Sequence, residues 1–347
     1  MTAAAGSNRR PRLDDVAAQV GVSPATVSLV LRGVTGPSAA TRERVLAAAD
    51  QLGYRPDRAA SALASRRSRT VGVLIDISST YESQLVLDLY DAAERRGYSL
   101  LLSTVNRRHD EERAAETLLD SRCAGLILLG PHAPKDALNR LGAQLPVVVV
   151  GREVPAGSVD VVRTADDDGV AEAVRHLAGL GHRRITFVTG PPGAVTALRR
   201  RGYETAMRDC GLVEWIAVVD GGLTEEDGVR AGGTIMAGAG AGSSADGGRF
   251  PTGLVMYNDR SAIGLIDTFN RGGVPVPAAA SVVGFDDSPV AALRLINLTT
   301  VAQDTGALAD NAMASLIERF DDGRTGRREV IVAPRLVVRG TTAPCGS

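Results

Sequence analysis

Two short stretches with helical spacing, joined by a glycine near the N-terminus, constrain this chain most. The first stretch carries its apolar residues at helical spacing, at Val16, Ala17 and Val20. Gly21 follows, as expected where a helix ends in a tight turn. The second stretch opens with Ser-Pro at positions 23–24, and serine is a good N-cap while proline suits the first helical position. The pattern predicts two helices joined by a tight turn, a unit that fits a DNA major groove.

The second predicted helix has one aliphatic face, which would pack inward, formed by Val27, Val30 and Leu31. Its opposite face carries Ala25, Ser28, Leu29 and Arg32. Ser28 and Arg32 could hydrogen-bond to base edges or phosphates. Ala25 and Leu29 could contact only apolar groups, such as a thymine methyl. An ordinary helical hairpin with a solvated face is the alternative that this pattern leaves open.

A third helix is predicted to begin at a cap at Ser38, to run through residues 41–50 and to stop at Gly53. Its inward residues would be Val45, Leu46, Ala49 and Leu52. Three helices could then close one small core. Residues 57–64 indicate one or two further helical turns with Leu63 as the lone large apolar residue. So short a helix is unstable alone, so we expect it to form only when a partner copy and a nucleic-acid groove hold it.

The N-terminal region resembles the lactose-repressor (LacI/GalR) family of transcriptional regulators, through residues 13–17, 22–31, 41–45 and 52–56. In that family the second helix reads the major groove, and a hinge helix pairs with its dimer mate in the minor groove. Leu63 falls where those proteins insert a leucine wedge that kinks the duplex; a contact between hinge and core is the alternative. The DNA-binding residues that the resemblance implies are Arg12, Ser23, Pro24, Ala25, Thr26, Ser28, Leu29, Arg32, Tyr54, Arg58 and Leu63.

Two departures from the family pattern affect the reading helix. The family places base-contacting side chains at the positions of Pro24, Ala25 and Leu29. Many members carry arginine at the position of Leu29, and many carry asparagine at the position of Arg32. The reading surface is therefore poor in hydrogen-bonding groups. Specificity is expected to depend on methyl contacts, the minor-groove wedge and DNA deformability.

Charge and cysteine usage bound the function class. Residues 1–70 contain 11 Arg and no Lys against 5 acidic residues, a balance of +6, whereas the whole chain is at −1. The basic part is thus the part expected to contact phosphate. The three cysteines are widely spaced, which suggests neither a disulfide framework nor a zinc site. With no apolar block of a secretory signal and no membrane-length apolar run, we expect a cytoplasmic protein.

From Thr70 onward, short apolar runs alternate with amphipathic helices, which is typical of parallel sheets flanked by helices. The expected strands are 71–75, 99–103, 125–129, 146–150, 184–189, 216–219, 253–257 and 281–285. The expected helices are 82–96, 111–121, 170–180, 196–210 and 259–272. Ligands of such sheets bind outside the carboxyl ends of the strands, so two facing half-domains would form a binding cleft.

The fold class is therefore α/β: a three-helix helix-turn-helix head and hinge helix, then two doubly wound parallel-sheet subdomains. The expected segments are a disordered basic leader (1–11), the head (12–56), the hinge and linker (57–69), the core (70–340) and a tail (341–347). Within the core we expect 70–162 and 289–303 in the first subdomain, and 163–288 and 304–340 in the second. The Gly, Ala and Ser-rich residues 232–248 are expected to form a mobile surface loop.

The resemblance extends to the core, through residues 180–185, 201–203, 257–259, 281–288 and 298–301. It implies the fold of periplasmic sugar-binding proteins, and it implies that Arg199, Asn258 and Asp286 hold the effector. A guanidinium, an amide and a carboxylate can together encircle a polyol. Helix capping is an alternative for Asn258 and Asp286, and a solvated helix face is one for Arg199. The expected effector-binding residues are Asp76, Tyr81, Arg199, Asn258, Phe285 and Asp286.

These features together predict a DNA-binding regulator, and we expect it to be a repressor. Its operator affinity is expected to depend on a small polar effector, with a sugar favoured. Neither a nucleophile elbow nor a paired-histidine zinc motif occurs, so we expect no catalytic residue, cofactor or metal. The acidic run 166–168 is interpreted as compensation of a helix dipole. Because the tail lacks apolar heptads, a homodimer is expected. A solute-binding protein or sensor with the same cleft fold, and an enzyme on a doubly wound fold, are the rival classes.

Overall fold

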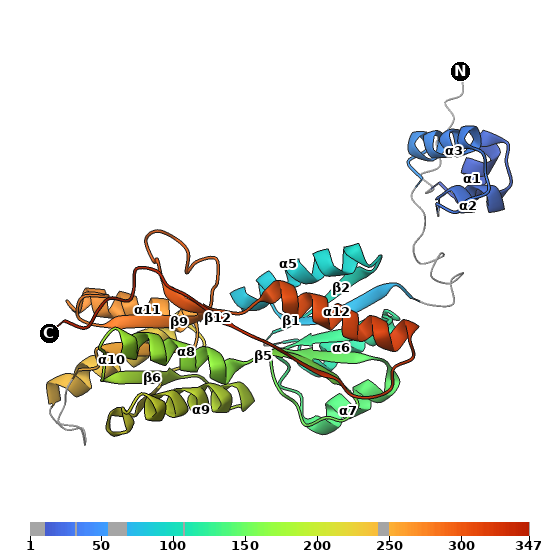
Figure 1. Ribbon diagram of the computed structural model, residues 1–347. Coiled ribbons are helices and arrows are strands. Elements are labelled where there is room, and N and C mark those ends of the chain that lie inside the picture. Colours follow the sequence, from blue (N-terminus) through green and yellow to red (C-terminus); the bar gives the residue numbers. More distant parts are fainter. Residues whose placement is uncertain (1–10, 32, 55–67, 107, 242–249, 347) are drawn as a thin grey trace. The chain divides into compact units, whose positions relative to one another are not determined.

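The computed structural model describes residues 11–31, 33–54, 68–106, 108–241 and 250–346. The chain divides into two compact units, residues 1–68 and 69–347 (Figure 1). The first unit, the head, contains α1 (Leu13–Val20), α2 (Pro24–Leu31) and α3 (Ala39–Gln51). The second unit, the core, contains all described strands. The expected hinge helix, with Arg58 and Leu63, lies outside the described residues.

The head has the predicted helix-turn-helix geometry. Gly21 adopts a left-handed φ of 71° and its N–H bonds to the carbonyl of Ala17, which ends α1. The side chain of Ser38 accepts a bond from the N–H of Thr41 and so caps α3, as predicted. The buried residues of the three helices form one cluster of Val16, Ala17, Val20, Val27, Val30, Val45, Ala48 and Ala49.

One inward position of α3 was predicted wrongly. Leu46 is 49% exposed, whereas Ala48 is buried beside Val45 and Ala49. These three buried positions lie at i, i+3 and i+4, so the helical period places Leu46 off the inward face. The core of the head is therefore built from small side chains, and a leucine remains on its surface.

The core contains two sheets of six strands each. The first sheet has the order β11-β5-β4-β3-β1-β2 and is parallel throughout. Its strands are β1 (Thr70–Asp76), β2 (Ser99–Val105), β3 (Gly125–Leu129), β4 (Val147–Val150), β5 (Asp160–Thr164) and β11 (Glu329–Val332). The second sheet has the order β12-β10-β9-β8-β6-β7, with only β12 antiparallel to its neighbour. Its strands are β6 (Ile185–Thr189), β7 (Ala217–Asp220), β8 (Gly253–Met256), β9 (Ser281–Asp286), β10 (Thr299–Ala302) and β12 (Arg335–Val337).

Helices cover both faces of each sheet, so the apolar strands are buried on both sides (Figure 1). The first sheet packs against α5 (Thr80–Arg95) and α12 (Thr305–Asp321) on one face, and α6 (Glu111–Asp120) and α7 (Lys135–Gln144) on the other. The second packs against α8 (Asp166–Gly179) and α9 (Ala194–Asp209) on one face, and α10 (Glu225–Ala241) and α11 (Asp259–Arg271) on the other. A short 3-10 turn (Val213–Trp215) follows α9. Each strand and helix expected for the core is present.

The chain passes between the two subdomains three times, and this corrects the expected partition. β10 pairs with β9, so residues 289–303 belong to the second subdomain rather than the first. α12 packs against α5 and β11 pairs with β5, so residues 305–332 belong to the first subdomain rather than the second. Only β12 and the residues after it return to the second sheet. The prediction that chain segments cross between the subdomains was right, but the segments were assigned to the wrong subdomains.

Two further segments are more ordered than their composition suggested. Residues 225–241 form α10, where the predicted loop 232–248 was expected to begin. Ala231 and Ile235 are buried there against the second sheet, because small residues allow α10 to pack close to α11. The tail docks on the second sheet: Thr341 donates its hydroxyl to the carbonyl of Val282 at 2.7 Å and is buried. Among the described residues, no helix is long and apolar enough to cross a membrane.

Candidate functional site

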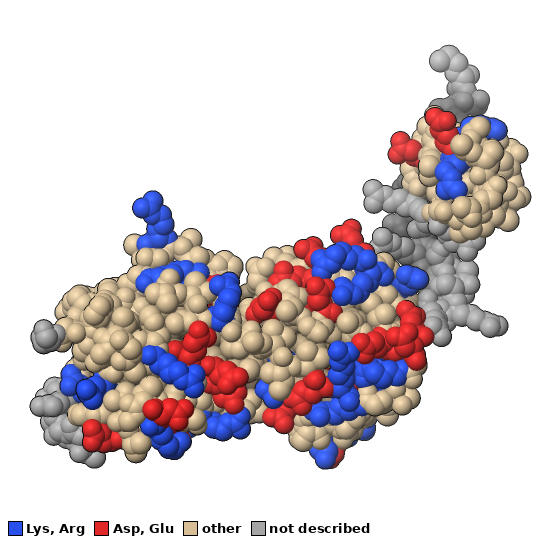
Figure 2. Space-filling model, in the orientation of Figure 1, with Lys and Arg blue, Asp and Glu red and all other residues tan. Residues whose placement is uncertain are grey.

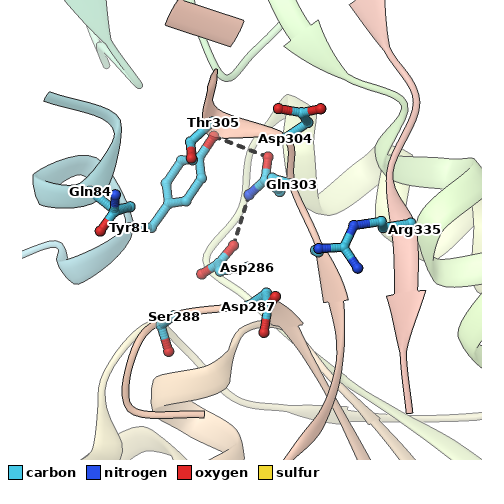
Figure 3. Close-up of a pocket in the computed structure, with 10 residues that line it drawn as sticks. Tyr81, Gln84, Asp286, Asp287, Ser288, Gln303, Asp304, Thr305 and Arg335 are labelled. Carbon is cyan, nitrogen blue, oxygen red and sulfur yellow. Dashed lines mark hydrogen bonds between the residues drawn. The ribbon is translucent and has the colours of Figure 1, made fainter. Parts of the chain in front are cut away.

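A cavity of about 290 Å³ lies between the two subdomains of the core (Figure 3). α5 contributes two polar side chains from the first subdomain, and the ends of β9 and β10 contribute most of the others. Nine of the ten lining residues carry polar side chains, which suits a ligand with many hydroxyl or charged groups. The lining residues are Tyr81, Gln84, Asp286, Asp287, Ser288, Ala302, Gln303, Asp304, Thr305 and Arg335.

A chain of hydrogen bonds in this cavity joins the two subdomains through Gln303, which lies on the crossover between β10 and α12. The hydroxyl of Tyr81 donates to Gln303 Oε1 at 3.1 Å, and the hydroxyl of Thr164 donates to the same oxygen at 2.6 Å. Gln303 Nε2 then donates to Asp286 Oδ1 at 2.8 Å (Figure 3). The amide orientation of Gln303 is therefore fixed by partners on three elements. A ligand that bonds to Asp286 would compete with, or extend, this chain.

Asp286 is the most perturbed carboxyl of the cavity. Burial raises its pKa to about 7; Arg199 opposes this shift, and the nearby Asp259 carboxyl adds to it. The backbone of Asp286 has a φ of 114°, outside the regions that L-residues favour. A side chain held in such a conformation at a cavity wall is typical of a binding site.

Asp259 holds the loop that carries Asp286. It is 1% exposed and accepts bonds from the N–H of Ser288 at 2.7 Å and from its hydroxyl at 2.9 Å. The hydroxyl of Thr300 on β10 is a further donor. Burial raises the pKa of Asp259 to about 6, although these hydrogen bonds lower it. Asp259 thus positions the loop through these hydrogen bonds and does not itself line the cavity.

Arg199 lies one layer behind the cavity. Its guanidinium pairs with Asp166 at 2.8 Å, and the two side chains are 5% and 2% exposed. It also donates to the carbonyl of Tyr257 and lies 3.6 Å from the ring centroid of Phe285. Burial is the largest influence on the pKa of Arg199 and lowers it, but Asp166, Tyr257 and Asp286 together outweigh burial and the net pKa is raised. Asp166 therefore does more than compensate a helix dipole, because it neutralises a buried cation.

The helix α2, which was predicted to read DNA, presents apolar residues at its exposed start. Pro24 and Ala25 are exposed and Leu29 is half-buried. The hydroxyl of Ser23 accepts the N–H of Thr26 at 3.1 Å and also bonds to the Thr26 hydroxyl at 2.9 Å. The predicted N-cap is thus confirmed.

The remaining predicted DNA-binding residues lie in different settings. The Arg12 side chain is exposed at the start of α1. Tyr54 packs against the core of the head. Ser28 is half-buried on α2. Arg32 lies outside the described residues, as do Arg58 and Leu63.

Each of the two units matches a known protein family. The family "Bacterial regulatory proteins, lacI family" matches residues 12–57, and the periplasmic binding protein-like domain matches residues 174–342. The transcriptional regulator MalR of Streptomyces coelicolor is 36% identical over 343 residues, covering 96% of each chain. This chain belongs to the LacI family.

Two solved structures of regulators resemble nearly the whole LacI-family chain. A lac repressor dimer bound to operator and an anti-inducer has a TM-score of 0.79 at 27% identity, over 96% of this chain and 100% of that one. The regulator CelR in complex with cellobiose has a TM-score of 0.68 at 27% identity, with the same coverage. The relatives are named as transcription regulators, and this LacI-family chain is a DNA-binding transcription regulator rather than an enzyme.

Of the six effector-binding residues predicted for this LacI-family chain, two line the cavity: Tyr81 and Asp286. Asn258 caps α11, because its Oδ1 accepts the N–H of Ser261 at 2.9 Å and its Nδ2 donates to the carbonyl of Leu223 at 3.0 Å. The capping alternative for Asn258 is therefore confirmed. Phe285 is fully buried and contacts Arg199 instead of offering an exposed ring.

Asp76 is exposed and its carboxylate accepts the N–H and hydroxyl of Ser78, outside the lining of the cavity. The sequence did not indicate the other eight lining residues, which are Gln84, Asp287, Ser288, Ala302, Gln303, Asp304, Thr305 and Arg335. Gln303 and Arg335 flank crossovers between subdomains, so the signal that could have found them is the position of those crossovers. Among the described residues, no group of three His, Cys, Asp or Glu side chains could hold a metal ion.

Proposed function

We propose that this LacI-family regulator is a repressor that binds operator DNA as a homodimer in the cytoplasm, and that a small polyhydroxylated effector in the core cavity controls its DNA affinity. The observation that carries this proposal is the polar cavity between the subdomains, with hydrogen bonds from Tyr81 through Gln303 to Asp286. Hydroxyl groups of a sugar can both donate to Asp286 and accept from neighbouring donors. The cellobiose bound by CelR supports a sugar as the class of effector.

The coupling follows from linkage. A ligand shifts an equilibrium between two arrangements only by its difference in affinity for them, typically about 1–3 kcal/mol. Because Gln303 bonds to residues of both subdomains, an effector that engages Asp286 would favour one arrangement of the subdomains. We propose that residues 57–69 form a hinge that orders on DNA, with Leu63 as a minor-groove wedge, and that this order depends on that arrangement.

Two measurements test the proposed function. Genomic fragments selected by the purified protein should yield one duplex that it binds in preference to bulk competitor, with an affinity that falls as salt rises. A thermal-shift screen of sugars, sugar acids and nucleosides should then yield a stabilising effector that changes the DNA affinity. If no promoter fragment is preferred, with or without those compounds, the proposed function is wrong.

Variants localise the two sites. Asp286→Ala should remove the thermal shift caused by the effector, whereas Asp136→Ala should keep it, because Asp136 lies exposed on α7 away from the cavity. Leu63→Ala should weaken specific DNA binding and leave the effector response intact. Light scattering should give the mass of a dimer, and a monomer bound to full-length operator would contradict the proposed assembly.

A further inference from the structure

The polar groups of the first turn of α2 are already engaged within the head. Ser23 caps the helix through the N–H of Thr26, and its hydroxyl bonds to that of Thr26 at 2.9 Å. Hydroxyls engaged in this way stabilise the start of the helix. A base that recruited them would have to compete with the cap. They are therefore poor readers of base edges.

Beyond that first turn, the half-buried Ser28 is the one polar residue of α2, and the other side chains of the helix are apolar. Residues 24–31 include no charged residue and no amide side chain. Pro24 and Ala25 are exposed, and Leu29, one helical turn beyond Ala25, is half-buried. Arginine to guanine and asparagine or glutamine to adenine are the usual bidentate contacts in a major groove, and α2 offers none of these side chains.

We infer that Ala25 and Leu29 read the 5-methyl groups of thymines in the operator half-site. This inference rests on the proposed function and extends it to the chemistry of recognition. The thymine methyl is the one apolar group that unmodified base pairs present in the major groove. An aliphatic pair one turn apart on a groove-facing helix is complementary to such methyls. The half-site is then specified by where its thymines lie, and phosphate contacts supply most of the affinity.

Base analogues test this directly on an operator obtained by selection. Each thymine of a half-site is replaced singly by deoxyuridine, which removes the methyl and keeps both hydrogen-bonding edges. At one or two positions the affinity should fall about fourfold, which corresponds to about 0.8 kcal/mol. At the same positions, a 5-methylcytosine–guanine pair should bind several-fold more tightly than an unmethylated cytosine–guanine pair. Thymines outside the half-sites serve as internal controls.

Protein variants assign the contact. Leu29→Ala should lower affinity for the thymine operator and bring its ratio of thymine to uracil affinity close to one, and Leu29→Met should restore the ratio in part. Leu46→Ala is the matched control, because Leu46 is a 49% exposed leucine of the same unit on α3. It should leave the ratio unchanged. Circular dichroism confirms that each variant is folded.

The outcomes separate this inference from the proposed function. If the protein binds its selected operator but uracil replaces every thymine without loss, methyl reading is wrong and the regulator assignment stands. Equal affinities for methylated and unmethylated cytosine at the sensitive positions would likewise overturn it. If no fragment is selected at all, the proposed function itself fails before the analogues are used.

Discussion

The head and the cavity of the core use polar side chains in opposite ways. In the head, the hydroxyls of Ser23 and Ser38 cap their own helices, and the exposed start of α2 presents Pro24 and Ala25. In the core, Asp286 and Gln303 are held at the cavity wall by partners from both subdomains. In the core, packing of the fold offsets the cost of burying and orienting these polar groups, whereas the polar caps of the head lie at exposed helix ends. Perturbations beside the cavity should therefore be larger than those in the head.

The largest effect should come from the buried ion pair behind the cavity. Arg199→Ala leaves the Asp166 carboxylate buried without its partner, and both side chains are at most 5% exposed. Breaking a buried pair in this way costs about 3–5 kcal/mol. Urea unfolding can be followed through Trp215, the single tryptophan, which packs against the core of the second subdomain.

A matched pair lies between the same two helices. Arg201 bonds to Asp167 with 63% and 29% exposure, so Arg201→Ala should change stability by less than about 1 kcal/mol. Equal losses for Arg199→Ala and Arg201→Ala would show that burial does not distinguish these pairs. The contrast between cavity and surface would then have no energetic basis.

Local signals in the sequence predicted the elements of both units. The serine caps, the glycine turn and the aliphatic spacing of the head are decided within a few residues, and the structure confirms them at Gly21 and Ser38. The apolar runs of the core likewise became strands. Leu46 was misplaced because two inward positions of α3 are alanines, which periodicity detects weakly. Residues 225–241 were mistaken in part for a loop for a similar reason, since glycine-rich composition hides a helix held by packing.

The cavity was harder to predict because long-range pairing decides its lining. Asp286 was predicted from the resemblance to the family, and it ends a buried strand at the cleft edge. Gln303 and Arg335 line the cavity only because β10 pairs with β9 and the chain then crosses to the other subdomain and back. The spacing of residues along the sequence does not indicate where the chain crosses between the subdomains. Arg199 was predicted as an effector contact, but it does not line the cavity and pairs with the buried Asp166, which was interpreted as compensation of a helix dipole.

The glycines of the head and of the core also differ in their packing. Substitution of a closely packed glycine should lower the free energy of unfolding by about 1–3 kcal/mol. The turn glycines of the head have open space around them, whereas Gly264 of α11 lies directly against α10. A Cβ at position 264 would overlap the carbonyl oxygen of Glu225, so Gly264→Ala should destabilise the core by the usual cost of overpacking. α11 begins with Asp259, which holds the loop of Asp286, so effector affinity should fall as well.

The control for this change is Gly233→Ala on α10, where nothing lies within 4 Å of an added Cβ. Alanine is the better helix former, by about 1 kcal/mol, so this variant should be as stable as the parent or more so. Urea midpoints of the two variants provide the measurement. A tolerated Gly264→Ala would mean that α10 and α11 can move apart without loss.

The pH dependence of stability tests the buried carboxyl of the cavity. The unfolded carboxyl of an aspartate titrates near pH 3.9, whereas burial raises the pKa of Asp286 to about 7. Between these values the folded state retains a proton that the unfolded state has lost, so stability falls as the pH rises. From pH 6 to pH 8 this group should lower the free energy of unfolding by about 1.4 kcal/mol.

Asp286→Asn removes this titration and keeps the shape of the side chain. Urea unfolding of parent and variant at both pH values measures the contribution of Asp286 together with its interaction with the neighbouring Asp259 carboxyl. The parent should lose more stability than the variant over this interval. Parallel losses would mean that Asp286 is ionised throughout and that its charge is balanced within the fold.

The smallest effect, about 1 kcal/mol, should come from a cap in the head. Ser38→Ala removes the acceptor for the N–H of Thr41, which lies 3.2 Å from the serine hydroxyl. Thr35→Ala is the control, since Thr35 is exposed in the preceding turn and surface changes of this kind stay within about 0.5 kcal/mol. Hydrogen exchange of the α3 amides measures the change within the head alone. A loss at Ser38 as large as that at Arg199 would reverse the comparison, because it would show that the head depends on its few polar groups as strongly as the core does.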